Sequence, residues 1–308
     1  MSYKEVSTPI ICIMGATGSG KTDLALNLAE RIPCEIISVD SAMIYRGMDI
    51  GTAKPSLAEL KCVKHHLVDI INPDEAFSVA SFLDLTNKAI VSALHKGKYP
   101  VLVGGTMMYF NALFNGLHDI PSSCPDVRNK VALELESNSL GYMYDKLRSV
   151  DPVYSAKIHA NDTQRILRAL EVYYSSGRIM SNILKSKVEK NNWNFKKFNV
   201  VFDDRGELHQ RIEARLKNMI DNGFVSEVES LRENYDLNNS HSSYRCVGYK
   251  QCFQYLQGEF GKEEMIQRSL FATRQLAKRQ LTWLRGLGDL TLLNFFYKNN
   301  IDVILNQI

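Results

Sequence analysis

The sequence lacks several features that mark membrane and secreted proteins. Its apolar runs fall far short of the roughly 20 residues that a membrane-spanning helix needs. Residues 1–5 do not have the pattern of a signal peptide. The six cysteines are scattered and form no Cys-x-x-Cys pair, so the sequence predicts neither a disulfide framework nor a zinc knuckle. We therefore expect a cytoplasmic protein with reduced thiols and no contact with a membrane.

The composition is that of an ordinary globular protein. The chain has 308 residues, of which 45% are hydrophobic and 23% are charged. This length allows one large domain, or one domain with an insertion, and a core that needs no covalent staples. The net charge of +3 says little about partners by itself.

The strongest motif is an eight-residue glycine-rich segment between an apolar run at residues 10–14 and a helical pattern after residue 22. Its members are Gly15, Ala16, Thr17, Gly18, Ser19, Gly20, Lys21 and Thr22. A strand, a glycine loop and a helix in this order predict a phosphate-binding loop, because backbone N–H groups and the helix N-terminus converge on an anion. Lys21 would reach the terminal phosphates and the Thr22 hydroxyl would hold Mg²⁺. The alternative is an ordinary tight turn.

Two polar residues follow predicted strands. Asp40 follows the apolar residues 34–39, and Thr106 follows residues 99–103 and two glycines. Ligands of open parallel sheets bind at the carboxyl ends of the strands, so both side chains are candidates for chemistry. The alternatives are that Asp40 only caps the next turn and that Gly104-Gly105-Thr106 is only a tight turn. A further short strand is predicted within residues 65–70; the paired histidines at its start have no partners at metal-binding spacing.

Several motifs together resemble one family. Residues 38–55 follow the order Ser-Val-Asp-Ser-x-x-x-Tyr-x-Gly-Met-Asp-Ile-Gly-Thr-Ala-Lys-Pro, and residues 103–109 follow Val-Gly-Gly-Thr-x-x-Tyr. With the glycine loop and with residues 164–173, 245–251 and 272–283, they resemble the bacterial tRNA dimethylallyltransferases, also called tRNA isopentenyltransferases. The resemblance implies an α/β fold in which a P-loop NTPase-like parallel sheet is flanked by helices and carries an all-helical insertion. The loop departs from the family, which usually has Pro at Ala16 and Ala at Gly18.

The turn-forming residues 121–125 mark a boundary inside the chain. Helical patterns follow at residues 126–138 and 140–150, and a third helix begins at Asp162 and ends at Gly177. We predict a helical insertion over residues 117–195 that grips tRNA, and a catalytic core formed by residues 8–116 and 196–308.

Basic charge is concentrated near the end of the chain. Residues 245–285 contain eight Lys or Arg and three Glu, a net charge of +5, which leaves −2 for the remainder of a chain whose total is +3. Arg274, Lys278 and Arg285 share one face of the predicted final long helix, a pattern typical of a polyanion-binding surface. Aromatic residues lie among these charges and could stack on bases; burial in the core of this arm is the alternative.

The reaction implied by the resemblance moves a dimethylallyl group from dimethylallyl diphosphate to N6 of the adenosine 3′ to the anticodon. Asp40 would take the proton from the amine, and Thr106 would orient it. The glycine loop with Mg²⁺ on Thr22 would stabilise the departing diphosphate, helped by Arg215 or by Arg211.

The resemblance also implies a set of contacts to the tRNA anticodon stem-loop, and nothing in the sequence demands more than a monomer. The family motifs place these contacts at Asp40, Ser41, Ala42, Met43, Thr106, Arg128, Gln164, Arg165, Ile166, Leu167, Arg168, Arg245, Cys246, Val247, Gly248, Tyr249 and Lys250. The concentration of charge adds Arg274 and Lys278.

Three other functions would explain some of these sequence features but not all of them. A small-molecule or nucleotide kinase would explain the glycine loop but not the basic arm. An isopentenyltransferase that acts on free adenine nucleotides would need no stem-loop grip. A nucleotide-switched RNA-binding protein would leave Asp40 at the strand end without a role.

Overall fold

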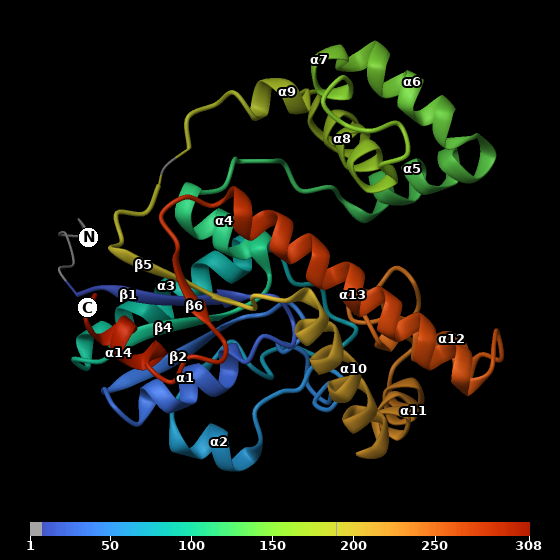
Figure 1. Cartoon of the computed structure of the whole chain (residues 1–308). Coiled ribbons are helices and arrows are strands. Elements are labelled where there is room, and N and C mark those ends of the chain that lie inside the picture. Colours follow the sequence, from blue (N-terminus) through green and yellow to red (C-terminus); the bar gives the residue numbers. More distant parts are fainter. Residues whose placement is uncertain (1–7, 189) are drawn as a thin grey trace. The chain divides into compact units, whose positions relative to one another are not determined.

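The computed structural model describes residues 8–188 and 190–308 (Figure 1). The chain divides into two compact units: one comprises the described residues up to Leu113 together with Asn192–Ile308, and the other comprises Phe114–Asn191. Residues 1–5, for which the sequence predicts no signal peptide, lie outside the described residues. Within the described part, no helix has both the length and the apolar character of a membrane span.

The first unit is built on a parallel sheet of six strands in the order β3-β2-β4-β1-β5-β6. The strands are β1 (Ile10–Gly15), β2 (Cys34–Val39), β3 (His65–His66), β4 (Tyr99–Gly104), β5 (Phe195–Val201) and β6 (Thr291–Asn294). The central strands β1, β2 and β4 are buried almost throughout, as expected for parallel strands covered on both faces.

Helices cover both faces of this sheet. Helices α1 (Lys21–Ala29) and α14 (Asn300–Leu305) bury Leu28 and Ile304 against Ile11, Ile13 and neighbouring residues of one face. Helix α3 (Val79–His95) packs against β2 and β4 on the other (Figure 1). The Ser78 hydroxyl accepts a hydrogen bond from the Ser81 N–H and so caps the start of α3. Helix α2 (Leu57–Cys62) also belongs to this unit, and α4 (Met107–Asn115) ends two residues beyond the division between the units.

Four helices of the first unit extend beyond the carboxyl ends of the strands. They are α10 (Arg205–Asp221), α11 (Phe224–Asn234), α12 (Tyr249–Leu256) and α13 (Lys262–Gly286). Phe224, Val228 and Phe253 form a separate core there with Tyr45 and Met48, which follow β2 in the chain. A smaller cluster packs Ala16 of the glycine loop against α10 and α13. These contacts fix the position of the loops at the strand ends.

The second unit consists of helices with a core of its own. They are α5 (Pro125–Ser137), α6 (Leu140–Val150), α7 (Pro152–Ser155), α8 (Thr163–Ser176) and α9 (Met180–Ile183). Met143, Leu147, Ile166 and Leu170 are buried at its centre. Asp162 caps α8, and Gly177 ends it in a left-handed conformation with φ of 67°.

The structure confirms the predicted fold class and corrects several boundaries. The unit division falls three residues before the predicted start of the insertion, and Phe195, assigned to the insertion, is the first residue of β5. The strand predicted within residues 65–70 stops at His66, because Leu67 and Asp69 have positive φ angles of 60° and 54° and cannot continue a strand. The last twenty residues, whose sequence contains no motif, form β6 and α14.

Candidate active site

The glycine loop turns from β1 into α1 through two left-handed glycines. Gly18 and Gly20 have φ angles of 79° and 80°, which residues with a side chain adopt only at a cost. A Cβ atom at Gly20 would also lie 2.5 Å from the ring of Phe295, so this ring packs directly on the loop. Arg211 of α10 donates from Nε to the Gly18 carbonyl at 2.9 Å and lies over the Phe295 ring. Arg211 therefore stabilises the loop through the Gly18 carbonyl and the Phe295 ring.

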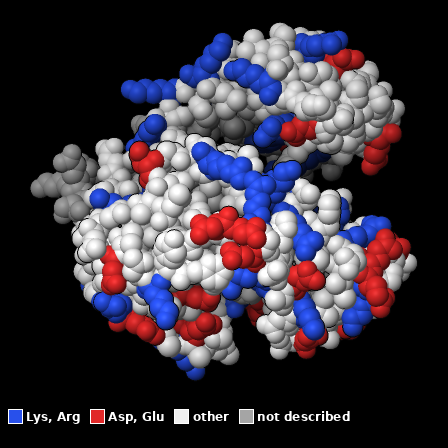
Figure 2. Space-filling view, in the orientation of Figure 1, with Lys and Arg blue, Asp and Glu red and all other residues white. Residues whose placement is uncertain are grey.

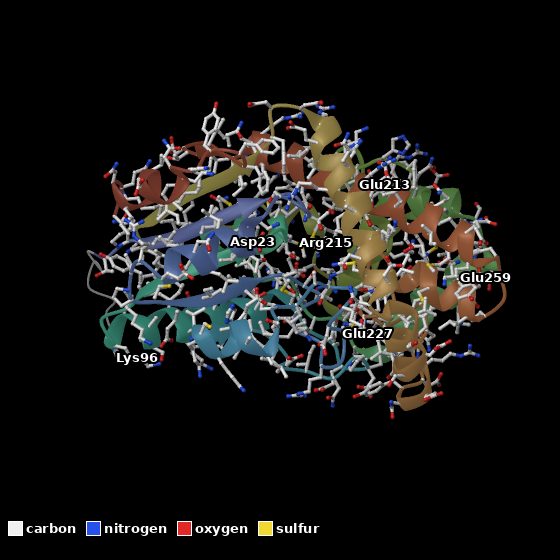
Figure 3. The ribbon with its side chains drawn as sticks, turned by 60° about the horizontal axis from the view of Figure 1, so that its bottom comes forward. Asp23, Lys96, Glu213, Arg215, Glu227 and Glu259 are labelled. Carbon is white, nitrogen blue, oxygen red and sulfur yellow. The ribbon has the colours of Figure 1, made fainter. Side chains whose placement is uncertain are left out.

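Lys21 and Arg215 bring two cations to the loop. Lys21 Nζ donates to the Ala16 carbonyl at 2.8 Å. Burial, together with the nearby charge of Arg215, lowers the pKa of Lys21 to about 8, although Asp40 opposes this shift. Arg215 belongs to α10 and donates to the Thr52 carbonyl at 3.0 Å. It lies on the side of α10 that faces α1, which carries Asp23 (Figure 3). An anion bound here would relieve the repulsion between the two cations.

Asp40 and Thr106 lie at the ends of the neighbouring strands β2 and β4 and hold the same turn. Asp40 Oδ1 accepts a hydrogen bond from the Ala42 N–H at 2.8 Å, and Thr106 Oγ1 accepts one from the Ser41 N–H at 3.0 Å. The capping role that the sequence left open for Asp40 is therefore present. It occupies one carboxylate oxygen and leaves Oδ2 for a substrate.

Two pockets meet at Asp40. The inner pocket, of about 90 Å³, is lined by Lys21, Thr22, Met43 and apolar residues of β2, β4 and α1. The outer pocket, of about 470 Å³, opens between α10, α13 and the segment 242–249. The residues that line both are Thr17, Asp40, Gly105, Arg215, Leu276 and Gln280. Asp40 and Arg215 therefore border both pockets.

One carboxylate holds the segment Gly-Met-Asp-Ile-Gly-Thr at residues 47–52, whose last two residues line the outer pocket. Glu227 of α11 accepts hydrogen bonds from the backbone N–H groups of Asp49, Ile50 and Gly51 at 2.8, 2.6 and 3.1 Å. Its Oε1 also accepts the Tyr249 hydroxyl at 2.6 Å. Glu227, labelled in Figure 3, thus connects this loop to α12.

The predicted contacts at residues 245–250 divide between pocket and surface. The outer pocket is lined by Arg245, Cys246, Val247, Gly248 and Tyr249, whereas Lys250 lies outside it. Burial raises the pKa of the Cys246 thiol to about 12, so this cysteine is neutral. Tyr249 is 1% exposed and supports the pocket wall.

Helix α13 presents different residues on two faces. Arg279 and Trp283 line the outer pocket, and Trp283 is 44% exposed. Arg274, Lys278 and Arg285 line a separate groove between α10 and α13, where Arg274 pairs with Glu213 at 3.1 Å. In Figure 2, Lys and Arg side chains gather along this helix with acidic side chains beside them. The basic face predicted from sequence therefore exists, but it is not the face that lines the pocket.

The remaining predicted contacts lie in the helical unit. Arg128 and Gln164 are exposed, and Arg165 is exposed and pairs with Asp162. Arg168 is half-buried and donates to the Pro121 carbonyl at 2.9 Å. Leu167 packs against the helical core, and Ile166 is fully buried in it. The side chain of Ile166 faces the core of the helical unit, so the predicted contact with RNA at this residue would have to involve its backbone.

The oxygen atoms near the loop suit a magnesium ion that shares a phosphate group. Thr22, the predicted magnesium ligand, lines the inner pocket. No cluster of three or more His, Cys, Asp or Glu side chains in residues 8–188 and 190–308 could hold a metal. Mg²⁺ usually binds one or two protein oxygens together with water and substrate phosphates. The donor set therefore fits Mg²⁺ accompanied by a diphosphate.

Gln280 is a site residue to which the sequence prediction assigned no role. It is 8% exposed and lies where the two pockets meet. Its place in the sequence carries a signal: it is three residues after Ala277 and four before Leu284, both buried on the same helix. A glutamine within such an apolar stripe must find hydrogen-bond partners in the protein, which indicates a special position.

Comparison with known proteins identifies the family. The family model of the IPP transferases matches residues 43–287. The tRNA isopentenylpyrophosphate transferase of Bacillus halodurans is 35% identical, with a TM-score of 0.71 and coverage of 99% of this chain and 95% of the other. The tRNA Δ(2)-isopentenylpyrophosphate transferase of Staphylococcus epidermidis is 30% identical, with a TM-score of 0.68 and coverage of 97% and 98%. A eukaryotic dimethylallyltransferase that acts on tRNA is 29% identical, with a TM-score of 0.79 and coverage of 98% and 77%.

The family model begins after the glycine loop, but the structural matches extend over nearly the whole chain and so include it. These comparisons agree with the parallel sheet and with the motifs at residues 38–55 and 103–109. The chain belongs to the IPP transferase family.

Proposed function

We propose that this protein transfers the dimethylallyl group of dimethylallyl diphosphate to N6 of the adenosine 3′ to the anticodon of tRNA. The observation that carries this proposal is the meeting of two pockets at Asp40, one ending on the phosphate loop and one opening beneath α13. A reaction that joins an alkyl diphosphate to a base needs both substrates at one carboxylate. A kinase would need no second wall of basic and aromatic residues such as Arg279 and Trp283.

The inner pocket suits the donor. The loop N–H groups, Lys21 and Arg215 lie where the diphosphate would bind, and Val68, Val103 and Ile36 line the remainder of the pocket. Apolar walls suit a five-carbon chain. When bound, Mg²⁺ would neutralise part of the charge on the diphosphate.

The outer pocket suits the acceptor base. An adenine in a folded anticodon loop must leave its stack to reach Asp40, and an exposed aromatic such as Trp283 gives it a surface on which to stack. Asp40 Oδ2 accepts a hydrogen bond from the N6 amine, and Thr106 helps to hold the turn that carries Asp40.

Bond making and breaking then follow from these positions. The N6 nitrogen attacks C1 of the dimethylallyl group, the C1–O bond breaks, and the diphosphate leaves with the bonding electrons. Asp40 takes the proton that N6 loses and later releases it to water. Lys21 and Arg215 stabilise the negative charge that develops on the leaving group.

The helical unit and the basic face of α13 are proposed to hold the anticodon stem through Arg128, Gln164, Arg165, Arg168, Arg274 and Lys278. We further propose that the protein acts as a monomer. We place the activity in the cytoplasm with the bulk of cellular tRNA.

The test is an incubation of the protein with unmodified tRNA, Mg²⁺ and dimethylallyl diphosphate labelled in the alkyl group. The label should enter the tRNA and, after digestion, appear in N6-dimethylallyl adenosine. A parallel reaction with γ-labelled ATP and free nucleotides should release or transfer no phosphate. Phosphate transfer without alkylation would overturn the proposal in favour of a kinase.

A further inference from the structure

Gln280 joins two glycine turns that are far apart in the sequence. Its Nε2 donates to the Gly105 carbonyl at 2.8 Å, and its Oε1 accepts from the Thr17 N–H at 2.8 Å. A carbonyl can only accept and a backbone N–H can only donate, so this orientation of the amide is the one that satisfies both partners. One side chain of α13 therefore bonds the phosphate loop and the turn after β4.

The two glycine turns approach this amide closely. A Cβ atom at Gly105 would lie 2.4 Å from Gln280 Nε2 and 3.3 Å from the Gly15 carbonyl oxygen. The two glycine turns are thus pressed together with the amide between them. Methionine at position 280 would have a similar size but would leave the Thr17 N–H and the Gly105 carbonyl without their partner.

The contacts continue from Gly105 to the catalytic carboxylate. Thr106, the next residue, donates its backbone N–H to the Val39 carbonyl at 3.1 Å, and its hydroxyl accepts from the Ser41 N–H at 3.0 Å. Ser41 adjoins Asp40. The position of Gly105 therefore sets the position of the turn that holds Asp40.

The same helix forms a wall for the acceptor. Arg279 and Trp283, one residue before and three residues after Gln280, line the outer pocket. Arg279, Gln280 and Trp283 lie within about one turn of the same helix. If RNA moves α13 through Arg279 or Trp283, the amide of Gln280 must move with it. Ordering of the phosphate loop by a diphosphate must act on the same amide through Thr17.

We propose that Gln280 is a positioning residue that couples donor binding at the phosphate loop to acceptor binding beneath α13. This inference rests on the proposed function, since it takes the two pockets to be the donor and acceptor sites. Coupling of this kind is reciprocal: a diphosphate strengthens RNA binding by the factor by which RNA strengthens diphosphate binding. Two neutral hydrogen bonds make a coupling factor of about tenfold reasonable.

The experiment measures binding of an anticodon stem-loop RNA with and without inorganic diphosphate and Mg²⁺, by fluorescence anisotropy. In the unaltered protein the diphosphate should tighten RNA binding about tenfold. In Gln280→Met the ratio should fall towards one, whatever the affinity of the variant for RNA alone. Gln267→Met makes the same chemical change at an exposed position of α13 outside both pockets and should retain the full ratio.

Two further measurements separate coupling from damage to the fold. Gln280→Glu keeps an acceptor for the Thr17 N–H but loses the donor to Gly105, so coupling and kcat should fall. The negative charge that it adds beside the phosphate loop should also weaken the binding of diphosphate alone. Thermal unfolding should show one cooperative transition well above the assay temperature for both variants, with the midpoint of Gln280→Met below that of Gln267→Met because two polar groups lose their partner. An undiminished ratio in a folded Gln280→Met overturns the inference, as does a wild-type ratio of one. Failure of the proposed function is a different result, namely no alkylation of tRNA by the unaltered protein.

Discussion

Asp40 holds the turn that it precedes: its Oδ1 accepts the Ala42 N–H at 2.8 Å while the rest of the carboxylate faces the two pockets. One side chain therefore has a structural and a proposed catalytic role, and a substitution must separate them. Asparagine can keep the bond to Ala42 through its amide oxygen, but it cannot take a proton from the substrate.

Asp40→Asn should therefore lower kcat for alkyl transfer by a factor of about 10³, since general-base catalysis contributes roughly 10²–10⁴. RNA affinity should change little. Single-turnover kinetics and stem-loop binding measure the two effects. Asp40→Ala serves as the comparison, because it removes the turn contact as well and should also weaken RNA binding. Near-normal turnover in Asp40→Asn would assign the base to another group.

The second prediction concerns the pH dependence of donor binding. The pKa of Lys21 is lowered to about 8 by burial and by Arg215, so Lys21 is charged below pH 8 and increasingly neutral above it. A bound diphosphate favours the charged form. Its affinity should therefore fall as the pH rises from 7.5 to 9.5, by up to tenfold for each pH unit above the pKa.

Lys21→Arg is the matched control, because arginine stays charged throughout this range. Titration of both proteins with inorganic diphosphate by calorimetry cancels the ionisation of the ligand itself. The variant should lose less affinity than the unaltered protein above pH 8. Equal pH profiles for the two proteins would show that Lys21 does not titrate in the site.

Much of this site follows from local sequence. A buried apolar strand, the glycine pattern and a helix specify the loop at residues 15–22, because each feature acts within a few residues. Asp40 and Thr106 could be placed together because parallel strands end at one edge of a sheet. The fold class follows from the same alternation of apolar runs and helical patterns.

The parts that sequence could not supply depend on distant packing. Gln280 contacts Thr17 across 263 positions, and no local pattern names its partners. The separation of Arg279 from Lys278 into pocket and groove depends on how α13 is rotated against α10, although the residues are adjacent. Strand β6 was missed because it is four residues long and only half-buried, so it has little apolar signal.

The third prediction concerns the contact between Glu227 and the loop at residues 49–51. Glu227→Gln should lower the free energy of unfolding by about 3 kcal/mol, because three backbone N–H groups and the Tyr249 hydroxyl lose their charged acceptor. Urea denaturation measures this loss. Glu229→Gln on the same helix is exposed and should cost less than about 0.5 kcal/mol. If the two variants have the same free energy of unfolding, Glu227 does not hold the loop.

The fourth prediction concerns acid stability and lies at the opposite end of β2 from the site. Glu35 is 2% exposed and accepts hydrogen bonds from His66, Lys96 and Lys98; Lys96 is labelled in Figure 3. Burial raises the pKa of Glu35, but these three partners outweigh burial and lower it to about 2. The carboxylate therefore stabilises the fold above pH 4.5 and loses this effect as the pH falls towards 2.

Glu35→Gln should be less stable than the unaltered protein by about 3 kcal/mol at pH 7, and the difference should shrink between pH 4.5 and 2. Urea unfolding at several pH values gives the comparison. A difference that stays constant down to pH 2.5 would mean that packing, not ionisation, accounts for it.

The fifth prediction separates the two faces of α13. Trp283 is exposed in the outer pocket, where a flipped adenine would stack on it, whereas Lys278 lies in the groove beside Arg274. Trp283→Ala should weaken stem-loop binding about tenfold, since stacking of a base on an aromatic ring contributes roughly 1–3 kcal/mol. For a stem-loop with an abasic site in place of the target adenosine, Trp283→Ala and the unaltered protein should bind with equal affinity.

Lys278→Gln should behave in the opposite way. Because a phosphate contact is indifferent to the base, the variant should weaken both stem-loops equally and reduce the slope of log affinity against log salt by about 0.8. Arg274 already pairs with Glu213, so Arg274→Gln should change this slope less than Lys278→Gln does. Titrations of the two RNAs at four salt concentrations distinguish the faces. A salt slope that changes with Trp283 but not with Lys278 would place the RNA backbone on the pocket side of α13.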